Sequence, residues 1–139
     1  MALRLILRPG DGFIPELSLV AQAADGTLIG HVLLTKTFVV QPDGSHYDSL
    51  LVAPLSVALE WREMGVGSAL MREGLRLARE MGYESVFLVG DPGYYGRFGF
   101  RETAGYGIRP QGDIPARFVL VCELVAGALD GVTGVGDFC

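Results

Sequence analysis

The hydrophobic positions of the chain change their period once, and this change predicts the order of the elements. Before residue 60, runs rich in Val, Leu and Ile alternate with turn residues, as is typical of β-strands. These runs span 18–22, 27–40 and 46–59. Asp25-Gly26 and Pro42-Asp43-Gly44 separate them and are strong turn signals. We therefore expect an antiparallel meander in the first half of the chain.

After residue 65 the apolar positions recur every three or four residues, which predicts an amphipathic helix. Its expected apolar stripe is Val66, Leu70, Gly74, Leu77 and Met81. Gly82 is a typical helix stop, and the run 84–89 follows as a buried strand. A strand, a helix and a strand form a βαβ unit, so the two strands should be parallel.

The rest of the chain predicts shorter elements and an antiparallel end to the sheet. Pro54 interrupts the third run, and because proline cannot donate to a ladder, it implies a bulge or a break. Residues 94–98 can form one short helical segment, and strands are expected near 106–108 and at 117–125. The glycine-rich tail after Gly127 should be irregular. We expect one domain over residues 1–139, of α/β (α+β) class with a mixed sheet.

Composition narrows the classes of function. Half of the 139 residues are hydrophobic, which suffices for a core, and the net charge of −5 without a basic run argues against nucleic acid as a partner. The longest uncharged apolar stretch, 49–59, is too short to span a membrane, and the N-terminus lacks a secretory pattern. Cys122 and Cys139 have no metal-ligand spacing, so we expect no metal site and a cytoplasmic setting.

The segment Arg62-Glu63-Met64-Gly65-Val66-Gly67 is the most informative one for function. It lies between an apolar run and the predicted helix, so its backbone N–H groups lie at the positive end of the helix dipole. Such a helix start binds phosphate, and two glycines allow a sharp turn and a close approach of the anion. The alternative is a tight strand-to-helix turn that binds nothing.

Three segments together resemble the GNAT superfamily of acyl-CoA N-acyltransferases. Residues 55–70 resemble its pyrophosphate-binding motif with the preceding strand, and 90–100 resemble its short helix ending in Gly-Phe. Residues 13–21, with Gly127-Ala128-Leu129-Asp130-Gly131, resemble its subgroup of predicted N-acetyltransferases of YhbS type. The chain departs from the family in its shortened N-terminal part. Residues 3–8 look like the last turn of the family's second helix, or form a strand.

The resemblance implies a mostly antiparallel sheet with a central parallel βαβ pair and acetyl-CoA as co-substrate. The pyrophosphate would bind the N–H groups of Met64, Gly65, Val66, Gly67 and Ser68, with Arg62 adding charge. The pantetheine arm would pair with Leu55, Ser56 and Val57, and the acyl carbonyl would point at a backbone N–H near Val57. Arg62 could equally be solvated, and Ser68 could serve only as an early-helix cap.

Tyr95 is the expected general acid, because its position five residues before Phe100 matches the Tyr-x-x-x-Gly-Phe spacing of the family. The alternative is that Tyr94 and Tyr95 only pack in the core or against the cofactor. Asp91 is expected to cap the short helix. No clear general base emerges from the polar groups near the relevant strands, which are Glu60, His46, Asp48 and His31. For His31, within an apolar strand, a structural hydrogen-bonded role is the more common one.

The resemblance implies an N-acetyltransferase that transfers acetyl from acetyl-CoA to a primary amine of a small molecule or peptide, by direct attack in a ternary complex. A non-catalytic acyl-CoA-binding or sensory module is the alternative. A nucleotide-binding protein fits less well, because the turn lacks the Gly-Lys-Ser/Thr of a phosphate loop. The acceptor is not readable from the residues, and an open sheet edge would suit a homodimer.

Overall fold

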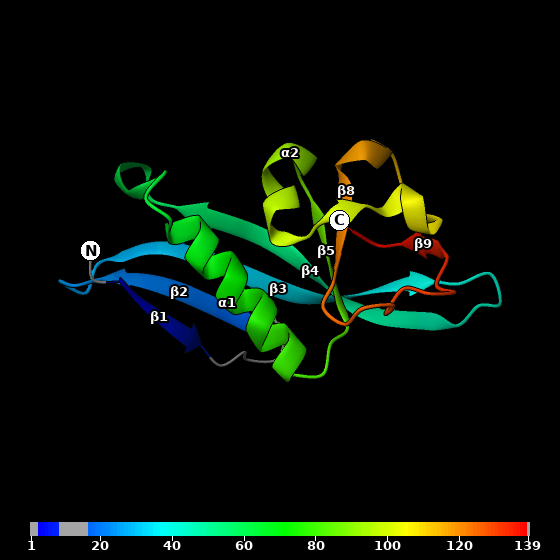
Figure 1. The fold of residues 1–139 in the computed structure, drawn as a ribbon, viewed down its shortest axis with the longest axis horizontal. Helices are drawn as coiled ribbons and strands as arrows, with labels where there is room; N and C mark the ends of the chain where they lie inside the picture. Colours follow the sequence, from blue (N-terminus) through cyan, green and yellow to red (C-terminus); the bar gives the residue numbers. More distant parts are fainter. Residues whose placement is uncertain (1–2, 9–16, 139) are drawn as a thin grey trace. The chain divides into compact units, whose positions relative to one another are not determined.

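The computed structural model describes residues 3–8 and 17–138, whose backbone forms a mixed α/β fold (Figure 1). The described residues belong to two compact units. The first contains residues up to Thr35 together with Val52–Leu77, and the second contains Lys36–Leu51 and the residues from Ala78 onwards. The long strands β3 (Leu28–Val40) and β4 (His46–Val57) contribute to both. None of the described helices is long and apolar enough to cross a membrane.

In the first unit, β1 (Leu3–Arg8), β2 (Leu17–Ala23), β3 and β4 lie side by side in that order. β1 and β2 pair antiparallel, as do β2 and β3, and the turn at Asp25-Gly26 is closed by the N–H of Gly26 donating to the carbonyl of Ala23. Residues 3–8 are therefore a strand, and the helical interpretation of this segment was wrong. Leucine at every second position fits the period of a strand.

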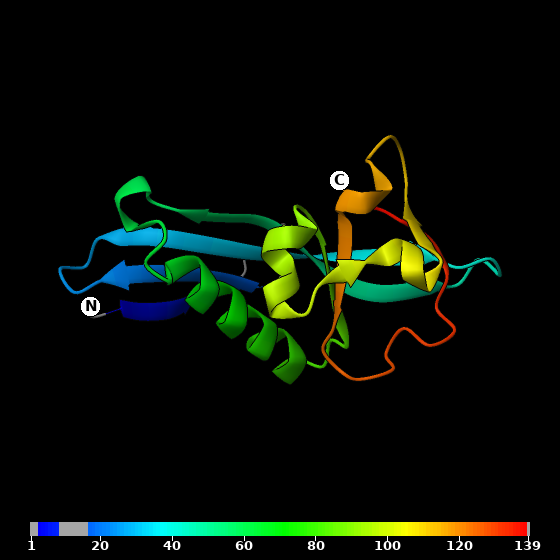
Figure 2. The same ribbon diagram turned by 45° about the horizontal axis from the view of Figure 1, so that its top comes forward.

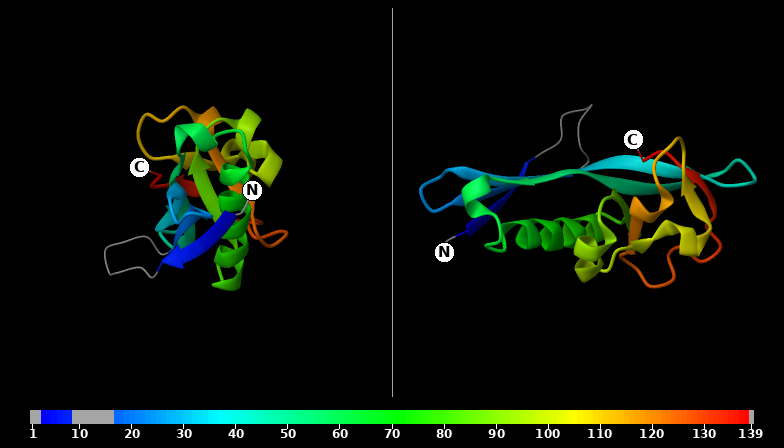
Figure 3. Two further views of the ribbon diagram at one scale, coloured as in Figure 1. Left: turned by 90° about the vertical axis from the view of Figure 1, so that its left-hand side faces the viewer. Right: turned by 90° about the horizontal axis from the view of Figure 1, so that it is seen from above.

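The helix α1 (Val66–Glu80) lies along one face of the strands of the first unit (Figure 3). Its buried positions are Val66, Leu70, Met71, Gly74 and Ala78. The predicted stripe was thus correct at its start and wrong at its end, because Met81 is 44% exposed. Met81 lies past the helix end, where Gly82 takes a φ of 96°. The N–H of Gly82 donates to the carbonyl of Arg79, and the N–H of Tyr83 donates to the carbonyl of Ala78. These two hydrogen bonds form a Schellman cap.

In the second unit, the first half of β4 is followed across the sheet by β5 (Ser85–Val89), β8 (Val119–Glu123) and β6 (Arg101–Glu102). α1 connects the neighbours β4 and β5 as a crossover, which makes them a parallel pair, whereas β5 and β8 are antiparallel. Before β8 the chain makes the 3₁₀ turn η4 (Ala116–Phe118), so the strand predicted at 117–125 is shorter than expected.

The strand predicted near 106–108 lies two residues later, at β7 (Ile108–Pro110). The 3₁₀ turn η3 (Thr103–Tyr106) occupies the earlier positions, and Gly107 ends it with a φ of 75°. A left-handed residue cannot continue into a strand in register, which explains the shift.

The glycine-rich tail is irregular as expected except for one short strand, β9 (Gly134–Gly136), which is antiparallel to β3 and parallel to β7. Gly134 is required there, because a Cβ at this position would collide with the carbonyl oxygen of Val40. Phe138 then stacks on Phe87 with ring centroids 4.6 Å apart. The core of this unit comprises Val39, Leu51, Phe87, Ile108, Val119, Val121, Leu129, Val132 and Phe138.

Candidate active site

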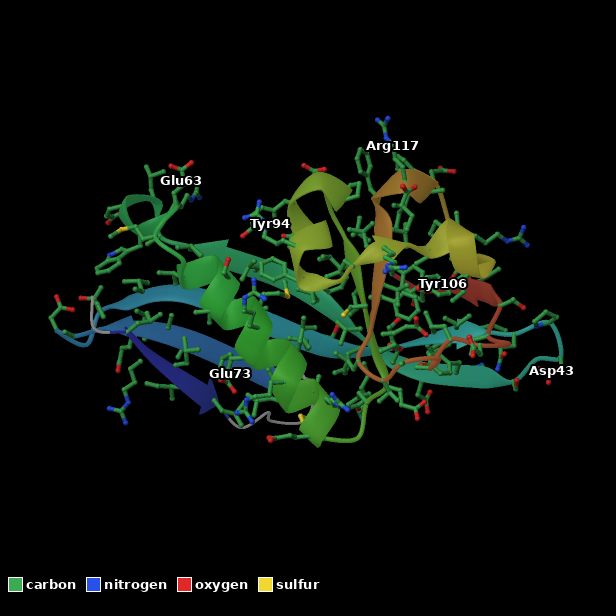
Figure 4. All side chains as sticks on the ribbon, viewed as in Figure 1. Asp43, Glu63, Glu73, Tyr94, Tyr106 and Arg117 are labelled. Carbon is green, nitrogen blue, oxygen red and sulfur yellow. The ribbon has the colours of Figure 1, made fainter. Side chains whose placement is uncertain are left out.

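The turn between β4 and α1 is built from a 3₁₀ turn, η1 (Leu59–Trp61), and residues 62–65 (Figure 2). The N–H of Ala58 donates to the carbonyl of Ile29 at 2.7 Å, which fixes the point where the chain leaves the sheet. Gly65 then adopts a φ of 85° and Glu63 a φ of 64°. Left-handed backbone is strained for a glutamate, and such strain is concentrated at functional turns. The Glu63 side chain extends away from the turn (Figure 4).

This turn presents unpaired backbone donors to solvent. The N–H of Ala69 donates to the carbonyl of Gly65 at 3.0 Å, which is the first hydrogen bond of α1. Among the described residues, no acceptor contacts the preceding N–H groups of Val66, Gly67 and Ser68. Met64 and Gly65 are exposed, so the positive end of the helix dipole is open. Chemically, this arrangement can bind a phosphate.

Arg62 is tied to the end of β4, because its Nε donates to the carbonyl of Val57 at 3.2 Å while the side chain stays exposed. The contact holds the guanidinium group beside the turn. Arg62 therefore places a positive charge near the start of α1, and its Nε–H is shared with the carbonyl of Val57.

The end of β4 and the start of α1 lie together in the first unit, and the lack of a side chain at Gly30 of β3 allows this close packing. A Cβ on Gly30 would lie 2.8 Å from Cδ1 of Leu70, 3.0 Å from Cγ1 of Val66 and 3.3 Å from the carbonyl oxygen of Ser56. Leu55 and Val57 are half-buried and Ser56 is exposed. The structure thus brings the predicted pantetheine-binding residues and the predicted pyrophosphate turn into one neighbourhood.

β4 runs without a break from His46 to Val57, so the interruption expected at Pro54 was wrong as a break. The described register irregularity lies instead between β2 and β3, at Ala21 and Gln22, which leaves Ile29 as the extra residue of a bulge. This bulge faces the exit of the chain from β4, because the carbonyl of Ile29 is the one that binds Ala58.

Tyr95 lies in the second unit, at the end of the short helix α2 (Pro92–Tyr95). Asp91 caps this helix, as expected, by accepting a hydrogen bond from the N–H of Gly93 at 2.9 Å. The ring of Tyr95 lies directly over Gly90, where a Cβ would come within 2.6 Å of it. Tyr94 meets it edge-on, with ring centroids 4.8 Å apart.

Burial keeps the Tyr95 hydroxyl in its protonated form. Burial raises its pKa above the ordinary value of 10.0, so the hydroxyl stays protonated at neutral pH. In the part of the chain that the structure describes, this hydroxyl has no hydrogen-bond partner. It can therefore give its proton to a group that develops negative charge beside it.

The other residues considered from the sequence divide into exposed polar groups and one buried thiol. His46 is exposed and stacks on Phe38 with ring centroids 4.3 Å apart, and Asp48 and Glu60 are exposed. Cys122 is buried, as expected, and burial raises the pKa of its thiol. Cys139 lies outside the described residues. The described residues hold no cluster of side chains that could bind a metal ion.

Sequence reasoning missed an arrangement around His31. Its Nε2 lies 3.3 Å from Oγ of Ser18, and His31 lines a cavity of about 330 Å³ together with Val20, Leu28, Ile29, Gly30, Ser56 and Ala58. The cavity therefore adjoins the same strand end that carries the predicted pantetheine-binding residues.

Comparison with known proteins identifies the family of the chain. Residues 9–100 match the family model described as the acetyltransferase (GNAT) family. The chain is also 35% identical, over 128 residues, to the uncharacterized N-acetyltransferase YhbS of Escherichia coli K12, a match that covers 92% of this chain and 74% of YhbS. The chain therefore belongs to the acetyltransferase (GNAT) family.

Two solved structures resemble the chain closely. The crystal structure of Escherichia coli YhbS in complex with CoA has a TM-score of 0.84 and 33% identity, covering 91% of this chain and 69% of that one. A GNAT family acetyltransferase from Brucella melitensis in complex with acetyl-CoA has a TM-score of 0.69 and 27% identity, covering 91% and 68%. The predicted fold class, a mixed and mostly antiparallel sheet with a central parallel pair, is confirmed.

Proposed function

We propose that this chain binds acetyl-CoA through the turn at the start of α1 and transfers the acetyl group to a primary amine by direct attack in a ternary complex. The observation that carries the proposal is the set of unpaired N–H groups at Val66, Gly67 and Ser68, preceded by the left-handed Gly65. A diphosphate supplies the acceptors that this helix start lacks.

The donor residues of the proposal are those of the turn and the strand before it. Met64, Gly65, Val66, Gly67 and Ser68 would hold the pyrophosphate, and Arg62 would add charge. Leu55, Ser56 and Val57 would bind the pantetheine amides through the backbone, with a main-chain N–H polarising the thioester carbonyl. The presence of CoA in the YhbS structure and of acetyl-CoA in the Brucella structure supports this assignment.

Tyr95 would supply the proton that the leaving thiolate needs. The half-buried ring, the raised pKa and the hydroxyl without a partner among described residues all suit an acid that must stay protonated until the C–S bond breaks. The rival interpretation is that Tyr95 only packs against its aromatic neighbours.

A non-catalytic acyl-CoA-binding module is the second candidate, because a helix start with unpaired N–H groups can bind the donor without any chemistry. It predicts binding of acetyl-CoA without turnover.

We also propose that the 139 residues act as one catalytic domain in the cytoplasm and form a homodimer. The acidic composition, the free buried Cys122 and the open edge strand β1 support these points.

Thermal shift with acetyl-CoA, ATP and NAD tests donor binding, and a thiol-release assay over a panel of amines tests turnover. We expect stabilisation by acetyl-CoA alone and thiol release with at least one amine. Tyr95→Phe should abolish most turnover and keep the acetyl-CoA shift. If acetyl-CoA produces no shift, the donor assignment is wrong, and if it binds without any turnover, the chain is a binding module.

A further inference from the structure

The cavity beside His31 lies on the face of the first unit that α1 leaves uncovered. Gly30, Val32 and Leu34 of β3 face α1. A Cβ built on Gly30 would contact side chains of α1, and a Cβ built on Gly74 of α1 would contact Val32 and Leu34. Side chains alternate along a strand, so His31 faces the other way. Val20 is its direct partner across β2 and lines the same cavity.

The cavity has the size and lining of a small-ligand site. Its volume of about 330 Å³ falls at the lower end of the range for ligand pockets. Val20, Leu28 and Ile29 give it an apolar wall, and Ser56 gives it an edge on the strand assigned to the pantetheine arm. Among the described residues that line it, His31 is the one titratable side chain.

Ser18 holds the imidazole in place. The Ser18 side chain is buried, and its hydroxyl lies 3.3 Å from Nε2 of His31. This contact with Ser18 helps to orient the ring, and the serine hydroxyl can pair with either tautomer because it both donates and accepts. The ring is thereby presented at the cavity as a group of defined geometry.

We propose that this cavity is the acceptor subsite, that it takes a compact primary amine with an apolar carbon body, and that His31 binds the amine and takes its proton. The inference rests on the proposed function, because the cavity adjoins Ser56 of the donor strand. A neutral imidazole can accept a proton from a bound ammonium group, which frees the lone pair of the amine.

The step balances as follows for an alkylammonium ion. His31 takes one proton and leaves a neutral amine, whose lone pair attacks the thioester carbonyl carbon and forms the C–N bond. The C–S bond then breaks, the thiolate is protonated by the general acid, and the nitrogen loses its second proton, through water, to the base form of that acid. The products are the amide, free CoA thiol and the one proton held on His31.

The test compares variants of the whole chain in the thiol-release assay, with phenethylamine and isoamylamine against spermidine and an aminoglycoside. The wild type should prefer the compact apolar amines. His31→Gln should lose about 100-fold in kcat/KM for them, together with the acidic limb of the pH profile, and keep its KM for acetyl-CoA. His46→Gln, at the other histidine, is the matched control and should behave as the wild type.

Leu28→Trp tests the cavity itself, because Leu28 is 50% exposed at its rim. The larger side chain should raise the KM for the amine and leave that for acetyl-CoA unchanged, whereas Leu7→Trp, at a leucine 51% exposed on β1, should have no effect. Ser18→Ala removes only the hydroxyl and should give a partial form of the His31→Gln defect.

Three results overturn the inference. They are a His31→Gln variant that matches His46→Gln, a wild type that prefers the bulky amines, and a Leu28→Trp variant that weakens the binding of acetyl-CoA instead of the binding of the amine. Each of these leaves acetyl-CoA binding and turnover by the wild type intact, so it contradicts the acceptor subsite alone. Loss of acetyl-CoA binding or of all turnover in the wild type would instead contradict the proposed function.

Discussion

Two glycines at the same helix–sheet contact should respond to alanine in opposite ways. At Gly30 the new Cβ would lie 2.8 Å from Cδ1 of Leu70 and 3.0 Å from Cγ1 of Val66, both on fully buried side chains. At Gly74 it would lie 3.6 Å from Cδ1 of Leu34 and 3.8 Å from Cγ1 of Val32, which is ordinary contact. Neither glycine has a left-handed φ, so the difference is one of space.

The magnitudes follow from these distances. Overpacking a core typically costs about 1–3 kcal/mol, and the lower entropy of the unfolded chain with alanine offsets roughly 0.4–1 kcal/mol of it. Gly30→Ala should therefore lower the free energy of unfolding by about 1–2 kcal/mol. Gly74→Ala, inside α1, should raise it by about 1 kcal/mol, because alanine is the better helix former.

Urea unfolding of both variants measures these changes, and Tm should shift by about 4 °C per kcal/mol. Because Val66 and Leu70 belong to the first turns of α1, Gly30→Ala should displace the turn and so weaken acetyl-CoA binding. A loss of about 1.4 kcal/mol in binding free energy lowers the affinity about tenfold. Gly74→Ala should leave that affinity unchanged. The packing argument is refuted if Gly30→Ala is as stable as the wild type or if Gly74→Ala is less stable.

Three further predictions concern the turn and the acid. Gly65→Ala, at a φ of 85°, should lose acetyl-CoA affinity in a binding titration, whereas Gly82→Ala, at a φ of 96°, should cost similar stability and keep the affinity; equal losses of affinity would contradict a role for the turn. Since burial raises the pKa of Tyr95, its acid form persists as pH rises, so the midpoint of any loss of kcat from its ionisation should lie above the ordinary value of 10.0, and Tyr95→Phe should lower kcat about 100-fold without changing the donor KM. Asp91→Ala should loosen α2 by about 1 kcal/mol and lower kcat, while Asp91→Asn, which keeps the capping oxygen, should not; equal activity of the two would argue against the cap as the device that positions Tyr95.

Local sequence patterns predicted most of the fold. The meander, α1 and β5 follow from turn signals and from a single change of hydrophobic period, and the end of α1 from Gly82. The tail could not be predicted in this way, because β9 is ordered by pairing with β3, about a hundred residues earlier in the chain, and not by its own composition. Tertiary pairing overrides weak local preference in such segments.

The candidate site was predictable where it depends on backbone and unpredictable where it depends on register. A glycine turn before a helix announces its free N–H groups, and the spacing to Phe100 identifies Tyr95. The Ser18–His31 contact depends on the bulge at Ile29, which shifts the β2–β3 pairing by one residue beyond what the Asp25-Gly26 turn would set. A one-residue shift exchanges the faces of a strand, so the sequence alone could not place His31 at the cavity.

The return of the tail to the core has a consequence for synthesis in the cell. Thr37 donates a hydrogen bond to the carbonyl of Asp137, 100 positions further on, and the next residue, Phe138, stacks on Phe87. A ribosome synthesises about 5–20 residues each second, so several seconds pass between the synthesis of β3 or β5 and the synthesis of the tail residues that contact them. During that interval the apolar core residues of the incomplete second unit stay exposed. Nascent chains stalled near residue 130 should therefore be bound by chaperones.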